Sequence, residues 1–140
     1  MAAIAITAAD RISPLFVGEA EIYNAICGVA ITRGQAVFFH ATTGKLALSN
    51  AGAAGTAKCC GIALEAGGAG QTISVLKRGH LAGFTLSGNY GSLAYLNDTD
   101  GVIGDAAGTT SKVVGAVVPL PDNPASPTKV LYVNADNWYA

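Results

Sequence analysis

Short runs of apolar residues alternate with clusters of Gly, Asn, Asp, Thr and Pro along most of the chain. This pattern is typical of short β-strands joined by tight turns, because turn-forming residues gather where strands end. Helical periodicity is weak by comparison. The pattern predicts eight strands, near residues 35–40, 46–48, 58–64, 71–76, 81–86, 92–97, 112–120 and 128–133.

One segment, GEAEIYNAIC at 18–27, fits two structures. A helix would place Ile22, Ala25 and Ile26 on one face. The segment lacks a convincing N-cap, however, and it ends at Gly28. A strand therefore fits this segment about as well as a helix does.

Two of the predicted turns have the same form. ATTGK at 41–45 and DTDGV at 98–102 each place a glycine where a left-handed backbone is sterically allowed. The matching turns belong to an internal repeat with an offset of about 57 residues. Its matching segments are 34–46 with 91–103, 58–64 with 112–118, and 73–76 with 130–133.

Two copies are too few for a solenoid or a propeller, which need several repeats to bury a continuous core. The sequence therefore predicts an all-β fold, a small barrel or sandwich built from two similar halves, with an extended N-terminal arm. A length of 140 residues suits one compact domain. We expect residues 1–29 to form an N-terminal arm or edge segment. We expect residues 30–140 to form a single β domain, duplicated at about 34–76 and 91–133.

Charge is sparse along the chain. Charged residues make up 12% of it, against about 25% in an ordinary soluble domain, and the net charge is -1. Such a surface has little electrostatic protection against association, so we expect a homo-oligomer. The basic residues are scattered, which argues against a nucleic-acid partner. The uncharged stretch 80–97 contains polar residues and turn formers, so it is not expected to be a membrane helix. No basic residue precedes the apolar start, so we expect synthesis in a cytoplasm.

The three cysteines invite a metal site, but the repeat favours packing. Cys59 and Cys60 align with Val113 and Val114, and neighbouring side chains of a strand point to opposite faces. The spacing C-x-x-C is absent as well. We therefore expect reduced, buried thiols and no bound metal.

The remaining candidate chemistry is equally weak. The glycine-rich stretch EAGGAGQT at 65–72 has Gln71 where a phosphate loop needs a lysine. His40 aligns with Asn97, which indicates a polar residue at a strand end, and His80 is expected in a loop. No nucleophile elbow or positioned carboxylate accompanies either histidine. We expect no catalytic residue and no cofactor, and hence no enzyme.

Both ends of the chain are apolar. The N-terminal segment contains Pro14, Leu15 and Phe16, and the C-terminal NADNWYA contains Trp138 and Tyr139. These side chains could pack on their own domain or contact partner subunits, because aromatic anchors are enriched at interfaces.

Four segments together resemble the small capsid decoration (cement) proteins of tailed bacteriophages: AITRGQAVFFHATTGKLAL, GIALEAGGAGQTISVLKRG, GSLAYLNDTDGVIGDAAG and VVGAVVPLPDNPASPTKVLYV. The resemblance covers about residues 30–133. It implies a structural virion protein that binds the outside of an icosahedral shell, with the major capsid protein as partner and a trimer as the favoured oligomer. It also implies that the N-terminal arm supplies shell contacts, through Ile4, Ile6, Pro14, Leu15 and Phe16.

Two other functions fit the same β architecture. A receptor-binding or fibre-tip module of a phage would bind a cell-surface glycan or protein through exposed aromatic residues around Tyr90 and Trp138. A small β-barrel enzyme would depend on His40 or His80.

Overall fold

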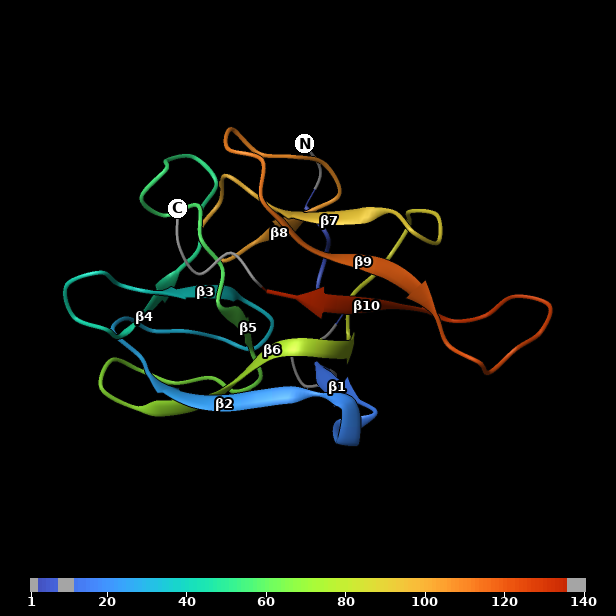
Figure 1. The fold of residues 1–140 in the computed structure, drawn as a ribbon, viewed down its shortest axis with the longest axis horizontal. Coiled ribbons are helices and arrows are strands. Elements are labelled where there is room, and N and C mark those ends of the chain that lie inside the picture. The colour runs from blue at the N-terminus through green and yellow to red at the C-terminus, as the bar shows by residue number, and fades with distance from the viewer. Residues whose placement is uncertain (1–2, 8–11, 136–140) are drawn as a thin grey trace.

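The computed structural model describes residues 3–7 and 12–135 of the chain, and it confirms the all-β prediction (Figure 1). One curled, ten-stranded antiparallel sheet has the order β4-β3-β5-β6-β10-β9-β7-β8, and β1 and β2 pair with β6 off this path. The elements are β1 (Ser13–Leu15), the 3-10 turn η2 (Val17–Glu19), β2 (Glu21–Ile26), β3 (Ala36–Phe39), β4 (Leu46–Leu48), β5 (Gly61–Ala63), β6 (Thr72–Ala82), β7 (Leu93–Leu96), β8 (Ile103–Gly104), β9 (Val113–Pro119) and β10 (Lys129–Asn134).

The predicted strands overlap strands of the structure, but β1 and β8 were not predicted, and the prediction differs around residue 80. The sequence predicted separate strands at 71–76 and 81–86, with His80 in a loop between them, and this prediction is wrong. The single long strand β6 spans Thr72–Ala82 and contains His80. Gly79 has φ 144°, a conformation in which a glycine continues the strand where the sequence suggested a turn. The ambiguous segment 18–27 contains a strand, β2.

The strands of the two halves pair in the same register. Val37 lies opposite Gly61 in the first half, and Ala94 lies opposite Gly115 in the second. The register of β3 with β4 reappears between β7 and β8. The matching pairs are Phe38 with Ala47, Phe39 with Leu46, Tyr95 with Gly104, and Leu96 with Ile103.

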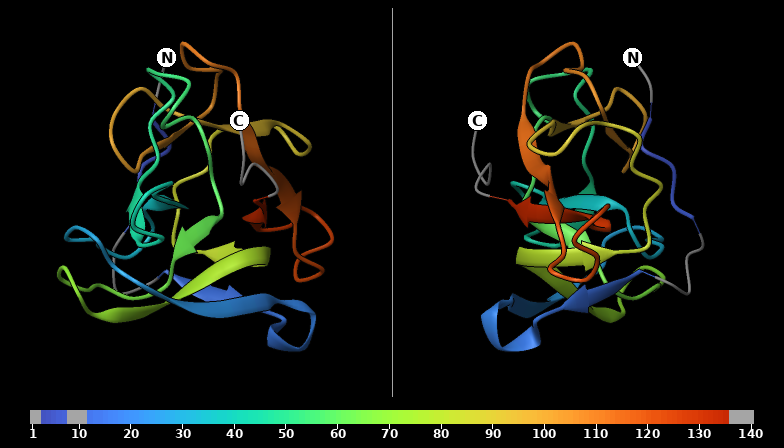
Figure 2. Two further views of the ribbon diagram at one scale, coloured as in Figure 1. Left: turned by 60° about the vertical axis from the view of Figure 1, so that its left-hand side comes forward. Right: turned by 90° about the vertical axis from the view of Figure 1, so that its right-hand side faces the viewer.

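The structural repeat begins earlier than the sequence match. Tyr23 of β2 lies opposite Val75, and the residue 57 positions later, His80, lies opposite Tyr132. Residues 21–77 and 78–134 are thus two consecutive copies of one five-stranded unit. β6 joins them, because its first half ends the first copy and its second half begins the second. Figure 2 shows β2 running along this strand beneath the rest of the sheet.

In the first copy, the residues after the first strand bond directly to the third strand of that copy. In the second copy, the N-terminal segment lies between the two equivalent regions and bonds to both. In the first copy the Gly28 amide donates directly to the Leu46 carbonyl at 2.9 Å. In the second copy the arm lies between the corresponding strands. The Thr85 amide donates to Ala5 at 2.8 Å, and the Ile4 amide donates to Ile103 at 2.8 Å.

Two hydrophobic clusters hold this arrangement. The smaller one lies within the first copy and includes Cys27, Ile31 and Cys60. The larger one collects residues of both copies, among them Leu76 and Leu131, so it joins the halves into one unit. Burial of these side chains is the main stabilising contribution, at about 25 cal/mol per Å² of apolar surface.

Candidate functional site

The thiols are packing groups in this fold. Cys27, Cys59 and Cys60 are fully buried and are not in disulfides. Burial raises the pKa of Cys59 to about 12 and that of Cys60 to about 11, because a thiolate is poorly solvated there. The hydroxyl of Tyr23 donates to the Cys60 carbonyl at 2.8 Å. Thiols protonated and enclosed in this way are poor nucleophiles.

His40 organises a turn. Its Nδ1 accepts hydrogen bonds from the amides of Thr42 at 3.2 Å and Thr43 at 3.4 Å. In the second copy the Oδ1 of Asn97 accepts from the Thr99 amide at 3.0 Å. The two side chains therefore have the same role, which supports the interpretation of His40 as a polar residue at a strand end.

The glycine-rich stretch at 65–72 uses its amides internally. The Gly68 amide donates to Gln71 Oε1 at 2.7 Å, and Gly67 exchanges backbone hydrogen bonds with Ile31 at 2.9 and 2.8 Å. The carboxylate of Glu65 accepts from the Ser74 amide at 3.1 Å. With these amides satisfied by protein acceptors, the stretch is built as a turn and not as an anion cradle.

An aromatic cluster connects the residue after β1 with β6 and β10. The ring of His80 lies 5.1 Å from Phe16 and 5.1 Å from Tyr132, in edge-to-face contacts. Lys77 and Arg78 pair with Glu21 nearby, at 3.7 and 3.5 Å. His80 is thus enclosed by rings on two sides and acts as a support for Phe16.

Phe16 has an unusual backbone. Its φ of 50° makes it the only non-glycine residue with positive φ in the described ranges 3–7 and 12–135. This conformation costs an ordinary residue roughly 1–2 kcal/mol. Nevertheless 47% of the Phe16 surface is exposed, as is 63% of the neighbouring Val17. We call these two residues the apolar tip, because they project from the β1–β2 connection.

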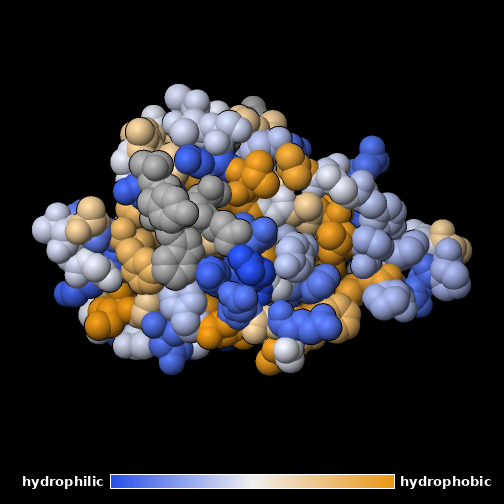
Figure 3. Space-filling view, in the orientation of Figure 1, coloured by the Kyte–Doolittle hydropathy of each residue, from blue (hydrophilic) through white to orange (hydrophobic). Residues whose placement is uncertain are grey.

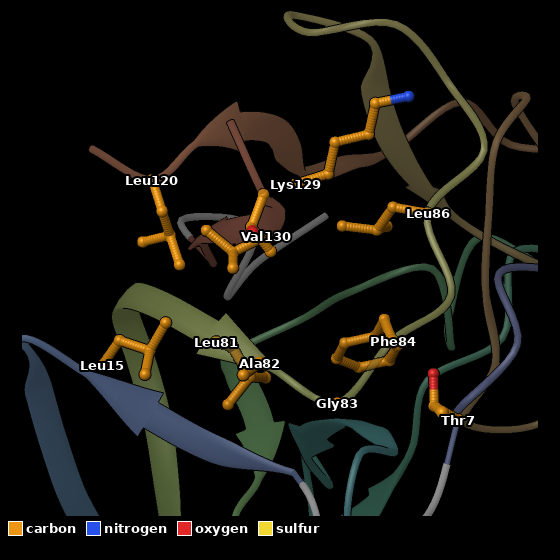
Figure 4. Close-up of a pocket in the computed structure, with 11 residues that line it drawn as sticks. Thr7, Leu15, Leu81, Ala82, Gly83, Phe84, Leu86, Leu120, Lys129 and Val130 are labelled. Carbon is orange, nitrogen blue, oxygen red and sulfur yellow. The ribbon is translucent and has the colours of Figure 1, made fainter. Parts of the chain in front are cut away.

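An apolar groove of about 340 Å³ is lined in part by Leu15, the residue before this tip. Figure 4 shows Leu120 and Val130 reaching into it from above, Leu86 from the right and Leu81 from below, while the Lys129 amine points away. We call it the arm groove, because Thr7 and Leu15 of the N-terminal segment complete its wall (Figure 4).

Comparison of the two copies explains why the arm groove is open. Phe84 and Val130 line it, and their counterparts in the first copy are Cys27 and Ile73. Gly67 packs closely on both counterparts, since a Cβ there would lie 3.3 Å from the Cys27 sulfur and 2.7 Å from Ile73. The corresponding proline-rich loop of the second copy extends away from the sheet (Figure 1).

The predicted contact residues divide into two groups. Ile4 and Ile6 are partly buried against the larger core, so they hold the arm to its own domain. Pro14 pairs with Leu81 in the sheet. Leu15 and Phe16 lie at the arm groove and the apolar tip. Neither the groove nor the strained backbone of the tip has a clear signal in the sequence.

The other predicted aromatic residues are less informative. Trp138 and Tyr139 lie outside the described residues. Tyr90 is 45% exposed. Its hydroxyl donates to the Pro127 carbonyl at 2.5 Å, and Lys129 Nζ lies 5.5 Å from its ring centre. Tyr90 therefore orders the proline-rich loop.

In the described part of the chain, no group of three or more His, Cys, Asp or Glu side chains is placed to hold a metal ion. Among the same residues, no helix has the length and hydropathy needed to cross a membrane. The chain matches no known family model, curated protein or solved structure.

Proposed function

We propose that the chain is a structural virion protein that binds the outer surface of an icosahedral phage capsid and clamps neighbouring copies of the major capsid protein. The observation that carries the proposal is the apolar tip. A strained, exposed aromatic residue costs stability in the free protein. Binding can offset this cost where the residue anchors a contact, because aromatic anchors supply much of the binding energy at interfaces.

The surroundings of the tip suit a contact of this kind. The ring of Phe16 rests edge-on against that of His80, which in turn contacts Tyr132, so Phe16 is held ready for binding. The arm groove next to it offers an apolar recess for a side chain of the shell. Each contact is small, but many copies on one lattice and several contacts per oligomer give a large avidity.

The resemblance to decoration proteins supports the same role. It implies a protein of the virion surface, made in the host cytoplasm, that forms a homo-oligomer, with a trimer as the predicted state. Nothing in this role involves nucleic acid, a membrane or a chemical step. The protein would act mechanically, by bridging seams between capsomers.

Co-sedimentation with expanded phage shells that lack the protein tests the proposal. The native chain should pellet with the shells and raise the temperature at which they break. Replacing the tip, with Phe16→Ser and Val17→Ser together, should reduce binding at least about tenfold, which corresponds to the loss of about 1.4 kcal/mol. Leu93→Ser is the matched control, because Leu93 is 44% exposed on β7, outside the tip and the groove.

Two outcomes test the decoration role and the assignment of the tip separately. A native chain that ignores shells contradicts the decoration role, and binding to a cell-surface glycan or protein would then favour the receptor-binding module. Equal binding by the native and tip-substituted chains would leave the decoration role standing but would contradict the assignment of the tip.

A further inference from the structure

The outer edge of β2 is the longest sheet edge left uncovered among residues 3–7 and 12–135. The edge of β4 is met by Gly28 and that of β8 by Ile4. The second half of β6 is covered by β1, which is itself only three residues long and has Pro14 at its centre. β2 has six residues with neither proline nor lysine, the residues that usually protect an edge.

The backbone of β2 shows which groups face outward. The Cys27 amide donates to Gln71 at 2.8 Å, and its carbonyl accepts from Gly70 at 2.7 Å, so both groups point toward the β6 side. Successive residues of a strand alternate in this direction. The amides and carbonyls of Ile22, Asn24 and Ile26 therefore point to the open edge.

The internal repeat shows that a strand fits at this edge. In the second copy, β1 pairs antiparallel with residues 80–82 of β6. The counterparts of these residues in the first copy are 23–25, in the middle of β2. The same architecture thus carries an extra strand at one of its two equivalent edges and presents the other uncovered by any described residue.

The exposed side chains of β2 identify what fits there. Ile22 is 40% exposed and Ile26 is 47% exposed, with the exposed Asn24 midway between them. The order Ile, Asn, Ile reads the same in both directions. Antiparallel pairing with an identical strand would therefore place isoleucine against isoleucine and asparagine against asparagine, with no like charges opposite each other.

We propose that two copies of the chain pair through β2, antiparallel about a two-fold axis at Asn24, to form one continuous sheet. Three hydrogen-bonded residue pairs would then exchange about six backbone hydrogen bonds. At each end, Glu21 of one copy would lie opposite Cys27 of the other, next to Gly28, whose ideal Cβ position lies 3.1 Å from the Lys45 Cβ.

The surface around β2 agrees with pairing of two copies at this edge. Figure 3 shows hydrophobic surface along the lower margin of the molecule, where β1 and β2 lie in Figure 1, interrupted by hydrophilic residues. The inference depends on β2 alone and not on capsid binding. It differs from the trimer that the resemblance favours, because a two-fold contact that uses the whole edge closes at two copies.

Cysteine cross-linking of the purified chain tests the register. Asn24→Cys would place two thiols on residues whose Cα atoms lie about 5.5 Å apart, within disulfide range. In the matched control Ile22→Cys, the two thiols would be separated by about 13 Å along the strand. The native cysteines are fully buried and do not compete. Under mild oxidation, Asn24→Cys should run at twice the chain mass of 14.0 kDa, and Ile22→Cys should not.

Light scattering on the reduced protein gives the second measurement. The native chain should have twice the monomer mass, and Asn24→Lys, which sets two like charges against each other, should have the monomer mass. Leu93→Lys should leave the dimer intact. A native monomer or trimer, or equal cross-linking of both cysteine variants, would overturn the proposal, whatever the result with shells.

Discussion

Gly61 and Gly115 give a direct test of the duplicated ladder. They occupy equivalent positions, each pressed against the neighbouring strand. A Cβ on Gly61 would lie 2.3 Å from Val75 Cγ1 and 2.7 Å from the Leu76 carbonyl oxygen. A Cβ on Gly115 would lie 2.2 Å from the Tyr132 carbonyl oxygen. Because a backbone oxygen cannot rotate away, an added methyl group must push the two strands apart.

The size of the effect follows from these contacts. Overpacking a core by a methylene costs about 1–3 kcal/mol, and each ladder hydrogen bond stretched by the displacement adds about 1 kcal/mol. We therefore expect Gly61→Ala and Gly115→Ala each to lower the free energy of unfolding by about 3 kcal/mol. The melting temperature should fall by about 10 °C. The larger loss should be at Gly115, whose nearest contact is backbone.

Urea unfolding followed by circular dichroism measures these changes. Two glycine variants serve as controls. Gly55→Ala meets no atom within 4 Å and should change stability by less than about 1 kcal/mol. Gly44→Ala also has free space but has φ +69°, so it should lose about 1 kcal/mol from backbone strain alone. Losses at 61 and 115 no larger than at 44 would refute the close approach of the strands.

Three further predictions concern other parts of the molecule. The native thiols should not react with an aromatic disulfide reagent at pH 8, whereas all three should react in denaturant, because they are buried and their pKa values are raised; prompt labelling of the native protein would contradict this. Phe16→Gly should change the free energy of unfolding by less than about 1 kcal/mol, because relief of the left-handed strain offsets the lost ring contact; a loss above about 3 kcal/mol in urea unfolding would instead indicate a core residue. Hydrogen bonds from Thr109 hold the pKa of Asp98 below its usual value, so this carboxylate stabilises the fold above its unfolded pKa and loses that contribution as the pH falls through the lowered one. In an NMR titration Thr109→Val should raise the pKa of Asp98, and an unchanged value would exclude this cause.

Local sequence signals predicted the strands well where a turn residue marks each end. Gly44 and Gly101 adopt φ of 69° and 73°, as their matched turns required. The repeat also predicted correctly that Cys59 and Cys60 are buried packing residues. The same reasoning failed at His80, since Lys-Arg-Gly-His has the composition of a loop. Gly79 instead lets one strand continue between two copies of the fold.

The sequence by itself determined the fold class, the turns and the existence of two similar halves, because these depend on the conformational preferences of neighbouring residues. Only the tertiary structure decided where each copy begins. The first strand of each copy is defined by its pairing with residues about fifty positions away. The sequences of the two first strands have almost no residues in common. Tertiary packing likewise decided the roles of the N-terminal residues. Ile4 closes the second copy, while Phe16 is left exposed on a strained backbone.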